Sequence, residues 1–200
     1  MRLFALVAVI SSSLPAFACI NGMREEDTAK AEAEQLLAKA ADRFDHRDFT
    51  ASLSFARQAL ESRAAGPPTR RQARRLIGKS QLRLGHFADA KKTLLQCLDE
   101  SGSPDDPGLL ARIGEAEVAL GKTAEGRARL EKLAEADLLP DADARVALAS
   151  ARFSAGETVG AYAAVKEALD QEPAHTGALA LKKLLDQKSG GQQAAGPPRS

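Results

Sequence analysis

The stretch Leu82 to Ala90, LRLGHFADA, places a glycine between two short amphipathic segments. Gly85 is followed by an aromatic residue two positions later and by a small residue five positions later. Similar stretches recur as HRDFTAS at 46–52, LGKTAEG at 120–126 and AGETVGA at 155–161. Their turn positions, Arg47, Gly85, Gly121 and Gly156, are 38, 36 and 35 residues apart. A period in the mid-thirties predicts a repeat architecture.

The composition favours helices. Of the 200 residues, 44% are apolar, 28% are charged and only 4% are aromatic, with no Trp. This balance is typical of soluble folded proteins. Ala, Leu, Glu, Lys and Arg dominate, and these residues lose little side-chain freedom in a helix. The sequence therefore predicts an all-α protein.

The first eighteen residues have a different character. Arg2 precedes the apolar run LFALVAVI, and the small residues of AFA stand before Cys19, as in a signal peptide that is cleaved after Ala18. The alternative is that Met23 starts a cytosolic chain. Cleavage removes Arg2 and no acid, leaving 28 − 1 = 27 basic and 27 acidic residues. A net charge of zero argues against nucleic acid as the main partner.

The two cysteines lead to different expectations. Cys19 follows PAFA, which resembles the lipobox of bacterial lipoproteins, although Ala16 stands where that motif usually has Leu. Lipidation of Cys19, which would be the chain's link to a membrane, and plain cleavage before it both remain open. Cys97 lies in an amphipathic stretch and is expected in the core. A Cys19–Cys97 disulfide is an alternative that nothing else in the sequence supports.

Around each turn position the same pattern holds, with small residues before it, a small residue five positions after it and an Ala-Leu-like pair further on. This pattern resembles the tetratricopeptide repeat family. Four units fit, at 33–66, 71–104, 107–140 and 142–175, with Arg47 in place of the turn glycine of the first unit and Gly126 in place of the small Ala of the third. The resemblance implies a solenoid of four helix hairpins within 24–188. Residues 174–188 have an apolar face and a charged face, which predicts a capping helix, and the composition of 189–200 predicts a disordered tail.

The small residues have a physical role that is independent of the family. Gly78, Gly114, Ala40 and Ala149 in the first helices let the second helices approach closely, which makes each hairpin. Gly and Pro pairs in ESRAAGPPT and DESGSPDDPG stop helices and predict loops between the units.

The sequence gives little evidence of catalysis. His46, His86 and His175 lie in or beside separate turns, without partners at metal-ligand spacing, and are expected to be solvated. HRD at 46–48 imitates part of a kinase loop, but the other kinase motifs are absent from the sequence. We expect no enzyme, no metal and no cofactor.

In the family that the chain resembles, the first helix of each hairpin lines a concave groove. The resemblance places Arg75, Lys79, Arg83 and Arg112 there as cations, and Phe44, Leu82, Val118 and Phe153 as an apolar line. Such a groove suits a protein or peptide that carries carboxylates. The alternative is that a cluster of basic residues only solvates an exposed helix and offsets Asp99, Glu100, Asp105 and Asp106. This cluster consists of Arg70, Arg71, Arg74, Arg75, Lys79 and Arg83.

The predicted function is that of an exported, non-catalytic adaptor in the periplasm or cell envelope. The alternative is a lipid-anchored assembly or scaffold component of a bacterial envelope complex. The carboxylate clamp of chaperone-binding family members needs Asn on the groove face, and the chain's only Asn is Asn21. Recognition of a chaperone tail is therefore not expected.

Overall fold

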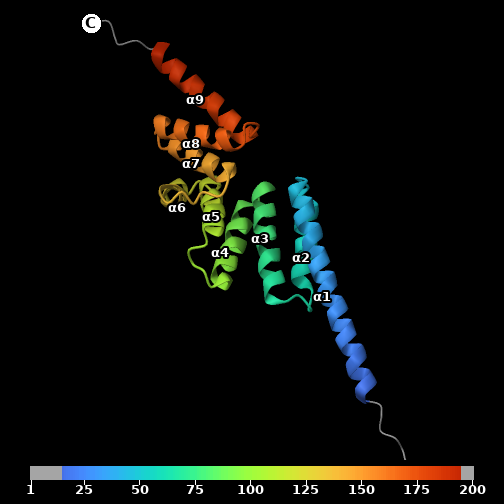
Figure 1. Ribbon diagram of the computed structural model, residues 1–200. Helices are drawn as coiled ribbons and strands as arrows, with labels where there is room; N and C mark the ends of the chain where they lie inside the picture. The colour runs from blue at the N-terminus through green and yellow to red at the C-terminus, as the bar shows by residue number, and fades with distance from the viewer. Residues whose placement is uncertain (1–14, 195–200) are drawn as a thin grey trace, which may run out of the picture.

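The computed structural model describes the backbone of residues 15–194 and the side chains of residues 25–189. Within this range the chain is all-α, as predicted, and has no strand. The helices follow one another along a curved stack (Figure 1). They are α1 (Pro15–Asp45), α2 (Phe49–Glu61), α3 (Pro67–Arg83), α4 (Phe87–Ser101), α5 (Pro107–Ala119), α6 (Thr123–Glu135), α7 (Ala142–Ser154), α8 (Thr158–Gln171) and α9 (Thr176–Ala194).

The helices pair into four hairpins, α1/α2, α3/α4, α5/α6 and α7/α8, and α9 packs on both α7 and α8. The first helices also contact one another in series, from α1 through α3, α5 and α7 to α9. Among the described residues the second helices make no such contacts with one another. The first helices therefore form an inner layer and the second helices an outer layer, which is the arrangement of a helical solenoid.

Three of the helices begin at an aspartate that caps them. The side chains of Asp48, Asp106 and Asp141 accept hydrogen bonds from the backbone N–H groups of Ala51, Leu109 and Ala144. Each bond satisfies one of the amide donors that a helix start leaves open. The hairpin ends are thus encoded locally, by a capping residue at the start of a helix and a turn at its end.

The four hairpin turns share one backbone conformation. Gly85, Gly121 and Gly156 have φ of 78°, 77° and 82°, and Arg47 takes the equivalent place in the first hairpin with φ of 60°. Left-handed backbone is costly for a residue with a Cβ atom. The Arg47 guanidinium lies 3.5 Å from the Glu172 carboxylate, which belongs to the fourth hairpin. The first turn therefore reaches across to the far end of the stack.

The two helices of a hairpin approach closely at glycines. A Cβ atom on Gly78 of α3 would lie 2.7 Å from the Leu94 side chain of α4. In the third hairpin a Cβ atom on Gly126 of α6 would lie 2.7 Å from the carbonyl oxygen of Gly114 in α5. These contacts confirm that small residues set the spacing of the helices in these hairpins.

The core is built mostly of alanine, with a smaller number of larger apolar side chains. The largest fully buried apolar side chains are Leu94, Ile113, Leu130, Leu148, Val165, Leu185 and Cys97. The burial of Cys97 confirms the sequence expectation. Tyr162 of α8 packs at the edge of a separate C-terminal cluster that α7, α8 and α9 form.

Two sequence expectations concern the ends of the chain. Helix α9 runs to Ala194, so the first residues of the predicted tail are helical, and residues 195–200 lie outside the described range. Most of the predicted signal peptide also lies outside it, and its last residues, from Pro15, form the start of α1. No helix in the described part of the chain has the length and apolar character needed to span a membrane.

Replacing Gly126 with Ala should destabilise the protein although Ala favours helices. The new methyl group would meet backbone of α5, which cannot move aside, and overpacking of this kind typically costs about 1–3 kcal/mol. Gly160 of α8 is the matched control, because there the Cβ would meet only the flexible Arg152 side chain, at 3.2 Å. Urea unfolding should show a lower free energy for Gly126→Ala, and an unchanged or higher one for Gly160→Ala. Equal effects would contradict the proposed packing.

Replacing Arg47 with Gly should stabilise the first turn. The change removes the steric cost of a Cβ atom in left-handed backbone, roughly 1–2 kcal/mol. Glycine also gives the unfolded chain more conformational entropy, which offsets part of this gain. We expect a net gain of about 0.5–1 kcal/mol in the free energy of unfolding, measured in urea. Arg47→Ala keeps the Cβ atom and should give no gain. A gain of the same size from Ala would mean that the turn is not strained.

Candidate functional site

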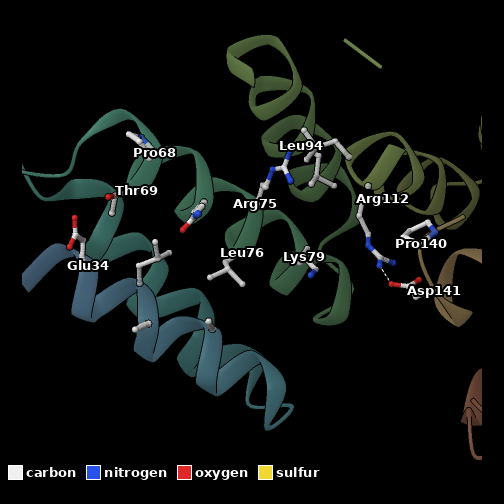
Figure 2. Close-up of a pocket in the computed structure, with 16 residues that line it drawn as sticks. Glu34, Pro68, Thr69, Arg75, Leu76, Lys79, Leu94, Arg112, Pro140 and Asp141 are labelled. Atoms are coloured by element: carbon white, nitrogen blue, oxygen red, sulfur yellow. Dashed lines mark hydrogen bonds and ion pairs between the residues drawn. The ribbon is translucent and has the colours of Figure 1, made fainter. Parts of the chain in front are cut away.

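The concave face formed by the inner helices contains two hollows. The first hollow has a volume of about 750 Å³ and lies between α1, α3, α5 and the start of α7 (Figure 2). Leu37 and Ala41 of α1 and Leu76 of α3 form its apolar wall. Arg75 and Lys79 of α3, Arg112 of α5 and Asp141 at the start of α7 supply its charged groups.

The second hollow has a volume of about 810 Å³ and continues toward α9. Its walls come from all four hairpins, and Phe44, Val118 and Val146 are among its apolar residues. Lys79, Arg112 and Asp141 line both hollows. An ion pair between Arg112 and Asp141 joins α5 to the start of α7 at this point, so it forms a partition between them.

The structure brings the four predicted groove cations to the concave face but gives three of them partners within the chain. Arg75 of α3 pairs with Asp106 at the start of α5. Arg83 pairs with Asp143 and lies 3.8 Å from Glu115. Arg112, whose side chain is only 7% exposed, pairs with both Glu115 and Asp141. These arginines therefore link different hairpins rather than stand free in the groove.

Lys79 is different from the three arginines. No carboxylate among the described residues forms an ion pair or a hydrogen bond with its amine, which lies 4.9 Å from the centre of the Phe44 ring. Burial and the neighbouring guanidinium groups of Arg112 and Arg83 lower the pKa of Lys79, and the Asp45 and Glu115 carboxylates, which make no ion pair with the amine, offset only part of this. Burial and the guanidinium groups disfavour the charged form, and an anion placed beside the amine would relieve both effects.

Two acidic groups and a histidine complete the network on the groove floor. Burial raises the pKa of the Glu115 carboxyl, and the guanidinium groups of Arg112 and Arg83 offset only part of this effect. His175 is not solvated as predicted, because its side chain is only 11% exposed. Its Nε2 lies 3.0 Å from Asp143, and its Nδ1 accepts a hydrogen bond from the backbone N–H of Ala178 at the start of α9. The network therefore connects α3, α5, α7 and α9.

The predicted apolar line is only partly present. Phe44 and Val118 line the second hollow. Leu82 is 7% exposed and belongs to the core cluster between α3, α4 and α5, so it is not a groove residue. Phe153 packs against the C-terminal cluster with the Lys188 amine 4.9 Å from its ring, and it lines neither hollow. The prediction took a single apolar position from each unit and so did not name the apolar wall at Leu37, Ala41 and Leu76.

The alternative reading of the arginine cluster is correct for some of its members. Arg74 pairs with Glu100 of α4 outside the two hollows, as expected of charges that offset nearby acids. His46 and His86 are exposed, which confirms the expectation for those two histidines. The described residues contain no cluster of His, Cys, Asp and Glu that could hold a metal ion.

No protein-family model matches the sequence, and no curated protein matches it. Solved structures do match the fold. TTC0263, described as a thermophilic TPR protein of Thermus thermophilus, has a TM-score of 0.50 and 17% identity, over 78% of this chain and 97% of its own. MamA AMB-1 has a TM-score of 0.52 and 17% identity, over 86% of this chain and 87% of its own. The chain therefore has the tetratricopeptide-type helical repeat fold that its sequence predicted.

Proposed function

We propose that the protein is a non-catalytic interaction module that binds a peptide or protein partner in its concave groove. The observation that carries this proposal is the pair of hollows on one face, built by the first helices of the hairpins. Each hollow lies within the size range of ligand sites, about 300–1,000 Å³. Together they offer apolar walls beside polar groups, the combination that suits a protein segment rather than a small substrate.

Two titratable groups of the groove, Glu115 and His175, support a binding role over catalysis. A general acid or base must be able to exchange its proton with a bound substrate. Glu115 is held by Arg112, and both ring nitrogens of His175 are engaged, one with Asp143 and one with the backbone of Ala178. These groups hold the hairpins together, and we assign them no chemical step.

Site-specific photocrosslinking in native cells tests the proposal. A photoreactive amino acid at Ala38 of α1 would face the first hollow, and one at Ala119 of α5 would face the second. Ala163 of α8 is the matched control, because it is exposed on the outer layer and lines neither hollow. We expect the same crosslinked partner from both groove positions and none from Ala163.

The crosslinked partner, once purified, permits a direct measurement. Ala38→Trp should fill the first hollow and weaken binding by about tenfold or more, since a displaced apolar contact is worth roughly 1–3 kcal/mol. Ala163→Trp should leave the affinity unchanged. Crosslinks of equal yield from both layers, or equal affinity of the two variants, would rule out the groove as the binding site.

We also propose that the protein is exported to the periplasm or cell envelope, on the strength of its N-terminal sequence. A lipid-anchored scaffold is the second candidate. It is supported by the form of α1, whose N-terminal part projects beyond the other helices of the first two hairpins (Figure 1). Cys19 lies in this projecting part, 14 residues before Ala33, the first buried residue among the described side chains. A helix of that length would hold the hairpins roughly 20 Å from an anchor.

Mass spectrometry of the mature N-terminus separates the two candidates. The adaptor predicts a chain that begins at Cys19 with a free amine. The scaffold predicts acyl chains on Cys19, and Cys19→Ser should then release the protein from the membrane fraction. A chain that keeps residues before Cys19, or that begins at Met23, would contradict both.

A further inference from the structure

The four groove cations are not equivalent, because the three arginines have acidic partners within the chain, and two of these partners also cap helices. Asp106 and Asp141 each use one carboxylate oxygen to cap a helix, α5 and α7 respectively. The other oxygen of Asp106 binds Arg75, and that of Asp141 binds Arg112. Because the caps fix these carboxylates in place, each one competes with any incoming acidic group for its arginine.

A carboxylate of a bound peptide would gain little free energy by pairing with the arginines. Binding to Arg112 would displace Asp141 and exchange one ion pair for another, while leaving a half-buried carboxylate without its partner. The same holds for Arg83, which Asp143 and Glu115 occupy. A peptide with several consecutive acids would also bring negative charges close to Glu115, Asp141 and Asp143, which line the second hollow, and like charges repel.

At Lys79 an incoming carboxylate would have no ion pair to displace. The Lys79 amine lies over the Phe44 ring, where the two hollows meet, and no described carboxylate forms an ion pair with it, although Asp45 and Glu115 attract it from farther away. An anion here forms a new ion pair and breaks none. On either side of Lys79 lie the apolar residues Leu76 of the first hollow and Val118 of the second.

From this arrangement we infer that the groove selects a peptide segment with one carboxylate flanked by apolar side chains, and that Lys79 receives that carboxylate. Asp106, Asp141 and Asp143 determine this specificity by neutralising Arg75, Arg112 and Arg83, so that polyacidic segments are rejected. The inference rests on the proposed function, and it adds the chemistry of the partner.

Selection from a random heptapeptide phage library tests this inference without knowledge of the natural partner. On the wild-type protein we expect peptides with one Asp or Glu next to large apolar residues. On Lys79→Gln the apolar residues should persist and the acid should disappear. On Asp106→Asn combined with Asp141→Asn, peptides with two or more acids should appear, because Asn keeps the helix caps while it frees Arg75 and leaves Arg112 with Glu115 as its one acidic partner among the described residues.

Affinities of synthetic peptides give the magnitudes. A peptide selected on wild type should bind Lys79→Gln about tenfold more weakly, and its acid-to-amide version should bind wild type and Lys79→Gln equally. Two matched control variants should bind the selected peptide with the affinity of the wild type. Lys92→Gln removes an exposed lysine of α4, and Asp48→Asn alters the cap of α2, where no arginine pairs with the carboxylate among the described residues.

The outcomes separate this inference from the proposed function. Peptides that bind wild type but not Ala38→Trp, with their acid retained on Lys79→Gln, would leave the groove as the site and overturn the assignment of Lys79. Polyacidic peptides selected on wild type would overturn the role of the aspartates. If no peptide is selected on wild type over Ala38→Trp, both the groove and the inference fail. Far-ultraviolet circular dichroism of each variant verifies that it is folded.

Discussion

The two helices of each central hairpin lie so close together that a Cβ atom does not fit at their crossing point, and the rest of the structure depends on this constraint. At Gly78 the space is taken by Leu94, and at Gly126 by the backbone of α5. Thin hairpins of this kind bury little apolar surface alone, so they are stable only when stacked. Stacking aligns the first helices on one face, and that alignment creates the groove.

The same alignment brings polar side chains of different hairpins together on the groove floor. Charges that are removed from water must be paired, or they destabilise the fold. Arg83 and Arg112 meet this requirement with acids from hairpins further along the chain. The groove that results has a nearly neutral floor, with apolar hollows on either side of the Lys79 amine. Shape and a local charge, rather than a broad positive surface, therefore distinguish one guest from another.

The fold could be predicted from the sequence because its signals are local. Turn glycines, capping aspartates and small residues at helix crossings each act within one hairpin, and their repetition along the chain shows the period. The groove cations could also be placed, since α3 is regular from Arg75 to Arg83.

The rest of the site depends on contacts between residues far apart in sequence. Nothing local indicates that Arg83 meets Asp143 or that Arg47 meets Glu172. Leu82 was misplaced because a position count within the repeat assumes an ideal unit, whereas here α4 and α5 cover that side chain. His175 was misplaced because its burial comes from the packing of α9 on α7, which the sequence of the turn does not reveal.

The position of Tyr162 has a practical consequence for studies of how the stack melts. The chain has one Tyr and no Trp, and this Tyr lies in the cluster that α7, α8 and α9 form. Its intrinsic fluorescence therefore reports on the last hairpin alone, whereas helical circular dichroism averages over the whole array. If the two signals change at the same denaturant concentration, the hairpins unfold as one cooperative unit. If they change at different concentrations, the last hairpin unfolds separately from the rest of the stack.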